Sequence, residues 1–438
     1  MEAAKRGKAS LTVVSQSFIG LGRAQQKALG SPDLPMALIP HPFGTRSRAE
    51  LKEIAAKCAD DIARLLCEAA PASSAAAANV VPAVPRAQLI EAPAELDELN
   101  KFYIKRRWGD GLIIAPPTQD AVQRMLRHTN RAPDDVVATI APGMGAATVE
   151  YIAIQGVMAG CYPEYLPVLI AAAEAVGTPK FHLQAIQSTT NPSAPWLIVN
   201  GPIAKWLEVN SGAGCLGPGT WANATLGRAL RLMLLNIGGA LPGEMDKATQ
   251  GQPAKYTFCC AENEEANPWE PLHVERGFAL EANTVTVVGA LGTWSMNMTA
   301  KKGEEVISMI ADTMQYPASS DYIYGGAPFI LLSPQHANLF HREGWSKAEV
   351  KRRLWEASKI RAGRSKGSEF ERMATGRRAE LGEIGPDSMV PISEKADDIS
   401  IIVAGGPGSH SVFVPVSAHT RSVTKEIVLT EKKHDHTR

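Results

Sequence analysis

The sequence lacks several features that would place it in a class at once. None of its six cysteines forms a CxxC pair or a zinc-type spacing: Cys58, Cys67, Cys161, Cys215, Cys259 and Cys260. Its 45 basic and 45 acidic residues cancel, so no global charge draws it to nucleic acid or to an anionic membrane surface. The longest apolar stretches, such as 167–173, are too short to span a bilayer. We therefore expect a cytoplasmic protein with reduced thiols and no nucleic-acid or membrane partner.

What remains is an ordinary globular composition, 45% hydrophobic and 21% charged, over 438 residues. Residues 1–68 predict a small unit in which the strand-like runs 11–15 and 35–40 alternate with the helical patterns 18–29 and 48–67. Two parallel strands cannot bury both faces of a sheet. We therefore expect the rest of this small domain to come from elsewhere in the chain or from a partner chain.

The remaining sequence predicts one long α/β body. Residues 69–95 are rich in Ala, Pro and Ser and are typical of a linker, residues 96–430 form the main domain, and residues 431–438 are a solvated tail. Residues 361–395 are charged and weakly periodic, which predicts an excursion over the surface.

A weak internal repeat lies within this body. The stretch Ala194–Ala204 resembles Ala327–Ala337, since each has Ala-Pro, a hydrophobic strand, a proline and then a helix. The predicted pair of repeats spans about 148–236 and 284–356, each with a strand or apolar segment, a helix, a strand and a helix. The predicted fold class is thus α/β, with a small N-terminal β-α-β-α unit and a larger body.

The first candidate site is the loop 210–219, which has four glycines and leads into a helix predicted for 220–236. Glycines let the backbone approach a ligand, and a helix start offers free N–H groups to an anion. The helix end would also lower the pKa of a cysteine in the loop. The residues concerned are Asn210, Ser211 and Gly214 for binding, Arg228 in the helix for an anion, and Cys215 as a reactive thiol. The alternative is a tight turn around a small buried cysteine.

The second candidate is the segment 259–277, whose acidic residues and histidine could converge as acid/base groups or as metal ligands. Its candidates are Glu262, Glu265, His273 and Glu275 for proton transfer and Arg276 for holding an anion. No HExxH or similar spacing supports a metal, so no metal ligand is assigned. The alternative is a solvated acidic loop.

The third candidate follows the strand predicted for 399–404. A glycine-rich turn there would lie at the carboxyl end of a strand, where ligands bind in open α/β sheets. The residues are Gly406, Ser409 and His410, and the alternative is an ordinary glycine turn. His336 and His341, five apart on a predicted helix, lack the spacing of a metal pair and predict one packed and one surface histidine.

Several short stretches resemble a known family. The N-terminal unit resembles the latter half of the UGSC-type (seleno)protein domain, and the body resembles the region attached to it in the long form of that family. The stretches that carry this resemblance are Phe18, Arg23–Gln25, Ala28–Gly30, Pro32–Pro35, Pro40–Pro42, Asp110–Leu112, Ala115–Thr118, Val157–Cys161, Val199–Pro202 and Gly344–Lys347.

The resemblance implies thiol or selenol chemistry at a Sec/Cys-Gly-Ser-Cys element. That element precedes the strand matched here by 11–15, and no CGSC occurs in this sequence. The family's reactive pair is therefore not carried onto any residue here. The expectation is that the half-domain with that element is missing and is supplied by a partner subunit.

Together these observations predict an enzyme subunit that acts on a small anionic or carbonyl-containing metabolite, with acid/base chemistry and thiol-dependent chemistry as a further option. A hetero-oligomer with the partner, or a homo-oligomer, is expected. The alternatives are a metal-dependent hydrolase or lyase and a non-catalytic scaffold. The residues do not decide between oxidoreductase and lyase, and none of them points to a nucleotide, flavin or pyridoxal phosphate cofactor.

Overall fold

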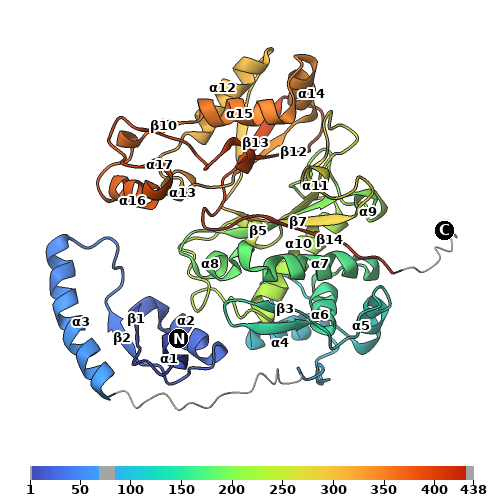
Figure 1. Ribbon diagram of the computed structural model, residues 1–438. Coiled ribbons are helices and arrows are strands. Elements are labelled where there is room, and N and C mark those ends of the chain that lie inside the picture. The colour runs from blue at the N-terminus through green and yellow to red at the C-terminus, as the bar shows by residue number, and fades with distance from the viewer. Residues whose placement is uncertain (1, 69–83, 431–438) are drawn as a thin grey trace.

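A computed structural model describes residues 2–68 and 84–430 (Figure 1). Most of the predicted linker and all of the predicted tail, residues 69–83 and 431–438, lie outside the described residues. Residues 84–95 form no helix or strand. Helices and mixed sheets together confirm the predicted α/β class. Within the described part of the chain, no helix combines the length and the apolar character needed to cross a membrane.

The N-terminal unit has the predicted alternation of strand and helix. The unit begins with the short helix α1 (Glu2–Lys5). It continues with β1 (Thr12–Ser15), α2 (Ile19–Ala28), β2 (Met36–Ile39) and α3 (Arg48–Glu68). The strands are parallel, with Val14 opposite Leu38. Gly22 lets α2 approach the sheet, since a Cβ there would lie 2.9 Å from Met36 Sδ. Gln25 Nε2 donates to the Pro142 carbonyl at 2.6 Å, which joins this unit to the body.

The first sheet of the body has the order β14-β7-β5-β6. These strands span Val423–Glu426, Thr284–Ala290, Ala194–Asn200 and Cys259–Ala261. Strands β5 and β6 are parallel, and β7 is antiparallel to both β5 and β14. Every residue of β5 and β7 is buried, as expected for apolar runs covered on both faces. One face is covered by α6, α7 and α10, which span Val149–Ala159, Leu166–Gly177 and Trp221–Asn236.

The second sheet has the order β12-β9-β13-β8. These strands span Ser400–Val403, Phe329–Leu332, His410–Val414 and Trp294–Asn297. Strands β9 and β12 are parallel, and β13 is antiparallel to β9 and β8. The helices on its outer face are α12, α14 and α15, which span Gly303–Met314, Pro334–Arg342 and Lys347–Ala357. The strand directions therefore repeat those of the first sheet, with β9, β12 and β13 in the places of β5, β6 and β7.

The two sheets pack face to face, which gives four layers in the order helices, sheet, sheet, helices (Figure 1). The apolar core between the sheets joins β5 to β9: the rings of Trp196 and Phe329 meet edge to face, with centroids 5.8 Å apart. The last strand, β14, returns to the first sheet beside β7, so the halves of the body interlock along the chain. Pairing of this kind places the ends of β5, β6, β9 and β12 close together.

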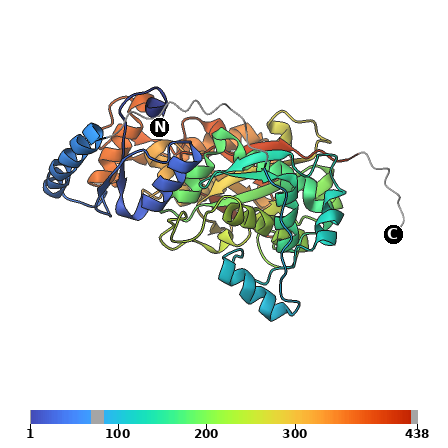
Figure 2. The same ribbon diagram turned by 90° about the horizontal axis from the view of Figure 1, so that it is seen from below.

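The remaining elements are short or peripheral. Helix α4 projects from the body in Figure 2. The helices are α4, α5, α8, α9, α11, α13, α16 and α17, spanning Leu96–Arg106, Gln119–Leu126, Leu183–Ser188, Pro202–Trp206, Leu272–Glu275, Ser320–Tyr324, Ser368–Gly376 and Arg378–Leu381. The strands are β3, β4, β10 and β11, spanning Val136–Ile140, Gly145–Thr148, Ile360–Arg361 and Met389–Val390.

Two sequence predictions differ from this arrangement. The apolar run 149–158 forms the buried helix α6 and is not a strand, because a short run that is apolar all round fits either element. Residues 361–395 are not a surface excursion, since Met373, Val390 and Ile392 are fully buried in the core of the second half. Their wide spacing among charged residues leaves no period that a sequence pattern could reveal.

Candidate functional site

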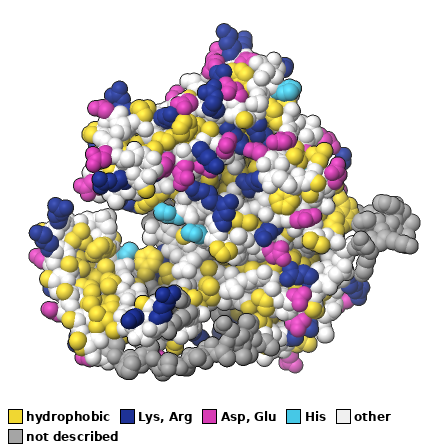
Figure 3. Space-filling model, viewed as in Figure 1, with side chains coloured by type: hydrophobic (Ala, Val, Ile, Leu, Met, Phe, Trp, Pro, Cys, Tyr) yellow, Lys and Arg dark blue, Asp and Glu magenta, His cyan; other side chains and the backbone are white. Residues whose placement is uncertain are grey.

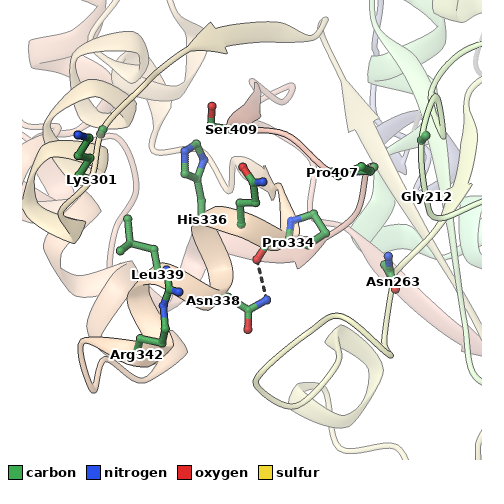
Figure 4. Close-up of a pocket in the computed structure, with 15 residues that line it drawn as sticks. Gly212, Asn263, Lys301, Pro334, His336, Asn338, Leu339, Arg342, Pro407 and Ser409 are labelled. Atoms are coloured by element: carbon green, nitrogen blue, oxygen red, sulfur yellow. Dashed lines mark hydrogen bonds between the residues drawn. The ribbon is translucent and has the colours of Figure 1, made fainter.

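A cavity of about 800 Å³ opens where the ends of the two sheets meet (Figure 4). Its walls come from the two glycine-rich segments, from the loop after β8 and from the first turns of α14. The lining residues are Gly212, Ala213, Asn263, Ala300, Lys301, Pro334, Gln335, His336, Asn338, Leu339, Arg342, Gly405, Gly406, Pro407 and Ser409. Each half of the body thus contributes to one site.

Backbone hydrogen bonds hold the two halves together at this site. The Asn263 amide after β6 donates to the Val403 carbonyl of β12 at 2.7 Å, and the Gly405 amide donates to the Ser211 carbonyl at 2.8 Å. Gly406 is needed for this close approach, because a Cβ there would lie 2.7 Å from Ala213 Cβ. The two glycine-rich segments, separated by almost two hundred residues, therefore form one continuous wall.

His336 is the histidine that lines the cavity. Helix α14 begins with Pro334 after Ser333, whose hydroxyl accepts the His336 amide at 3.3 Å. This cap places the imidazole in the first turn, where it is only 2% exposed. Its ring stands beside Ser409 in Figure 4. Its Nε2 atom is buried and has no hydrogen-bond partner among the described residues.

The opposite ring nitrogen, Nδ1, has the Ser411 hydroxyl as its partner. His336 Nδ1 lies 2.8 Å from Ser411 Oγ, and the same oxygen accepts the Ser333 amide at 3.1 Å. When the hydroxyl gives its own proton to Nδ1, the proton of the neutral ring is on Nε2. Burial lowers the pKa of His336, and the charge of His410 adds to this effect. Burial therefore favours the neutral ring, and its buried Nε2 has no hydrogen-bond partner in the described chain.

The charged groups that line the cavity are cationic. Lys301 and Arg342 lie toward one end, and Gly212, Asn263 and Pro407 lie toward the other (Figure 4). No carboxylate is among the lining residues of this cavity in the described chain. The first turn of α14 adds the positive end of a nine-residue helix. The field in the cavity therefore favours an anion.

The residues predicted in the first glycine-rich loop mainly hold its shape. Asn210 Oδ1 accepts the Gly212 amide at 2.8 Å, and the Asn210 amide donates to Asn223 Oδ1 at 2.8 Å. Gly214 has a positive φ of 68°, which glycine adopts without strain. The binding roles predicted for Asn210, Ser211 and Gly214 stay predictions, since their neighbours Gly212 and Ala213 line the cavity instead.

In the second glycine-rich segment, two of the three residues predicted to bind a ligand line the cavity. Gly406 and Ser409 line it, whereas His410 is exposed on β13, with its Nδ1 3.2 Å from the Met296 carbonyl oxygen. His410 does not line the cavity, so its predicted binding role stays a prediction.

The acidic segment after β6 forms a closed polar network. Glu262 is 3% exposed and accepts hydrogen bonds from Asn200 Nδ2 at 2.8 Å, Asn267 Nδ2 at 2.9 Å and the Leu272 amide at 2.8 Å. Burial raises the pKa of Glu262, although Lys347 and these donors oppose the rise. His273 is fully buried, with its Nδ1 3.9 Å from Glu264 Oε1. This network fills the end of the first sheet beside the cavity.

The remaining charged candidates have partners elsewhere. Glu265 pairs with Lys205 on the surface at 3.0 Å. Glu275 pairs with Lys347 and Lys351.

The predicted anion-binding arginines are also occupied. Arg228 holds Asp110 with two hydrogen bonds of 2.8 and 2.9 Å. Arg276 donates to Ser422 at 2.7 Å and to Thr424 at 2.8 Å. None of these candidates lines the cavity, so their catalytic and binding roles stay predictions. Among the described residues, no group of three or more His, Cys, Asp or Glu side chains could hold a metal ion.

Sequence reasoning did not select His336, Lys301, Arg342 or Asn263. His336 was expected as a packed histidine, and it is indeed buried. A usable signal was the Ser-Pro-x-His start of a helix directly after a buried strand, because that placement puts the ring at a strand's carboxyl end. Lys301 and Arg342 carry no such signal, since both lie among other charged residues.

The comparisons with known proteins concern the N-terminal unit. Residues 1–68 match the model of the UGSC family. No curated protein and no solved structure matches the chain. The N-terminal unit is therefore a UGSC-family segment, which confirms the resemblance seen in the sequence for these residues. The cavity is built from residues beyond the matched range.

Proposed function

We propose that this chain is an enzyme subunit that binds a small anionic metabolite in the cavity and transfers a proton through His336 Nε2. The observation that carries the proposal is the buried Nε2 of His336, which has no partner in the described chain and belongs to a residue that lines a cavity whose charged groups are Lys301 and Arg342. A buried polar atom without a partner is costly, and a bound ligand would satisfy it.

The arrangement suits a ligand with an anionic group and a nearby carbonyl or hydroxyl oxygen. Lys301 and Arg342 would attract the carboxylate or phosphate, and the two glycine-rich segments would let the backbone approach the remainder of the ligand. A bound anion would favour the imidazolium, whose Nε2–H would give its proton to the oxygen. The neutral imidazole that is left, with Nδ1–H donating to Ser411 Oγ, would take a proton back at Nε2. Ser411 would orient the ring throughout, because its hydroxyl is held by the Ser333 amide. Acid/base chemistry of this kind serves lyases and isomerases as well as oxidoreductases.

The test compares His336→Gln with a control on the same helix, His341→Gln, whose side chain is exposed and does not line the cavity. Inorganic phosphate and small dicarboxylates are titrated while the imidazole resonances are followed by NMR. We expect saturable binding that shifts the His336 signal, and a weakening of about threefold for each of Lys301→Ala and Arg342→Ala.

Turnover is then screened over small carboxylate and phosphate-ester metabolites. His336→Gln should lower kcat by about 10² to 10⁴ and change binding far less, whereas His341→Gln should behave as wild type. Absence of saturable anion binding at His336, or full turnover by His336→Gln, would contradict the proposal.

We also propose that the N-terminal unit pairs with a partner polypeptide that adds a strand to its sheet. Within the described residues, β1 and β2 pair only with each other, so both outer edges have unpaired backbone groups. Val13 and Leu38 are each 46% exposed, and Figure 3 shows hydrophobic side chains gathered on this unit. An apolar strand from a partner would pair with one of these edges and pack beside the exposed side chain of that edge strand.

Purification of the full chain from its native host tests this part. A stoichiometric second polypeptide is expected, and Leu38→Lys should release it. Leu280→Lys is the control, because Leu280 is 59% exposed outside this unit. A partner that stays bound to the Leu38→Lys variant, or a monomer with no second polypeptide by light scattering, would refute strand pairing.

A further inference from the structure

An exposed apolar row runs along the outer side of α4. Leu96, Asn100 and Ile104 follow one another at intervals of four residues, and side chains at this spacing are neighbours on a helix surface. Leu96 is 51% exposed and Ile104 is 63% exposed. The inner side of the helix is covered, since Leu99 and Tyr103 are buried in the core of the first half. Helix α4 therefore has one apolar side that packs on the body and another that faces outward.

The segment after α4 widens this row. Asn100 Oδ1 accepts the Ile114 amide at 2.8 Å, so this segment passes beside the middle of the row. Ile114 is buried in the core, whereas its neighbour Ile113 is 67% exposed and Leu112 is also exposed. The Ile113 carbonyl accepts a hydrogen bond from Arg228 at 2.9 Å, which fixes the segment to α10. These residues form the α4 surface: Leu96, Asn100, Ile104, Leu112 and Ile113.

Two charged side chains of opposite sign border the row. Asp97 and Lys101 each follow a residue of the row by one position, which places both along the same edge of the helix. Both are exposed, and Lys101 also pairs with Glu98 of its own helix at 2.7 Å. The edge therefore presents an acidic position and a basic position about one turn apart.

This pattern is complementary to itself when one copy is turned by half a rotation about an axis at Asn100. In an antiparallel pair of such helices, the rise of about 1.5 Å per residue places Leu96 of one copy level with Ile104 of the other. Asp97 of one copy then lies within about 3 Å, measured along the helix axis, of Lys101 of the other. A parallel pair in register would set Asp97 against Asp97. The pattern thus fits an isologous interface, in which the same patch serves both copies.

We propose that two copies of this chain dimerise through the α4 surface, with their α4 helices antiparallel about a two-fold axis at Asn100. Leu96 of each copy packs on Ile104 of the other, and Asp97 pairs with Lys101 across the edge. Helix α4 projects from the body, which leaves its outer side accessible to the second copy (Figure 2). The dimer covers an apolar patch of a kind that monomeric proteins rarely leave in water. The inference goes beyond the proposed function and does not depend on His336 or on the partner of the N-terminal unit.

The mass of the purified full chain tests the interface. Light scattering at about 10 µM should give twice the mass of the chain, because interfaces of standard size bind at micromolar affinity or tighter. Ile104→Glu should weaken dimerisation at least about a hundredfold, since each dimer loses two apolar contacts and gains two charges in their place. Leu280→Glu is the control, because Leu280 is exposed outside the α4 surface and its variant should stay dimeric.

Circular dichroism verifies that both variants are folded. A wild-type chain that stays monomeric, or an Ile104→Glu variant that stays dimeric, would overturn the proposal. A monomer that binds lipid vesicles through Ile104 would also overturn it, because the surface would then have a different occupant.

A mixture of two cysteine variants tests the antiparallel arrangement. Leu96→Cys and Ile104→Cys are made in a Cys67→Ala background, since Cys67 is an exposed native cysteine. Mild oxidation of the mixture should give a disulfide-linked dimer, because residue 96 of one copy faces residue 104 of the other. Each variant alone should give none, since its two cysteines lie about 12 Å apart along the helix axis. A linked dimer of the Leu96→Cys variant alone would contradict the antiparallel pair.

A mixture of two charge variants tests the edge. Asp97→Lys alone and Lys101→Asp alone should each weaken dimerisation about tenfold, because each homodimer sets like charges opposite each other twice. Their mixture should recover wild-type affinity, since both opposite-charge pairs form again in the mixed dimer. A mixture that dimerises no more tightly than either variant would overturn the predicted pairing. None of these results bears on anion binding at His336.

Discussion

The two sheets have the same strand directions, but different side chains surround the ends of their strands. In the first half, the space after β5 and β6 is filled by Asn200, Glu262 and His273: Asn200 Nδ2 and the Leu272 amide donate to Glu262, whereas Asn200 Oδ1 and His273 Nδ1 are buried without a partner in the described chain. In the second half, the space beyond β9 and β12 is open and is lined by His336, whose buried Nε2 has no partner in the described chain. The acid/His-rich end therefore stabilises the body, and the end with fewer ionisable groups has the geometry of a binding site.

This contrast changes how the two histidines are interpreted. His273 is surrounded by protein, with Nε2 3.1 Å from the Leu280 carbonyl oxygen, so a ligand has no space there. His336 is buried to a similar degree but adjoins a cavity. Burial alone does not separate a structural histidine from a functional one; an adjoining cavity does.

The largest effect that tests this comparison is on stability. Glu262→Ala should lower the free energy of unfolding by about 3 kcal/mol, because Asn200, Asn267 and the Leu272 amide would lose their buried acceptor. His336→Ala should cost about 1 kcal/mol, since it removes a single hydrogen bond to Ser411.

Urea unfolding of both variants measures the difference, with Glu265→Ala as the control for an acidic residue of the same segment on the surface. Glu265 is 83% exposed, so its removal should leave the midpoint almost unchanged. Equal losses for Glu262→Ala and His336→Ala would remove the distinction between a structural and a functional end.

An intermediate loss of stability is expected for a substitution where the two glycine-rich segments contact each other. Gly406→Ala should destabilise the protein by about 2 kcal/mol, because the new Cβ would lie 2.7 Å from Ala213 Cβ and 2.9 Å from its Cα, and the wall must separate. Gly212→Ala is the matched control on the same wall, since its Cβ would meet nothing closer than Asn210 Oδ1 at 3.5 Å. Phosphate affinity should fall in the first variant only. A wall that tolerates both alanines equally would show that the two loops are not held in contact.

The glycine-rich segments of the cavity wall were predictable, because each is marked by a pattern within a few neighbouring residues. The strand 399–404 and the glycine run after it, and the glycine loop before α10, are visible in the sequence as turns that follow strands or precede helices. Their meeting was not predictable, because it depends on Asn263 bonding to Val403 across the sheets.

The tertiary partners of the charged candidates were not predictable for a related reason. Arg228 was expected to hold an anion, and it holds Asp110, which is 118 residues away in the chain. Partners at such separations follow from tertiary packing, and no spacing along the sequence reveals them. His336 was assigned correctly as buried, but a cavity beside it is a property of several segments together and of no single one.

The smallest effect concerns pH and again separates the two ends. The folded-state pKa of His336 lies below its ordinary value of 6.5, so between these two values the unfolded chain binds more protons than the folded chain. Stability should therefore rise with pH through this window and fall as the pH drops from about 7 to 5. His336→Gln should show a shallower decline in urea unfolding over that range, while His341→Gln should follow wild type. Saturating phosphate should flatten the wild-type decline, because a bound anion favours the imidazolium and raises the pKa of His336. An identical decline in wild type and His336→Gln, with and without phosphate, would mean that neither the buried ring nor an anion beside it controls the protonation of this site.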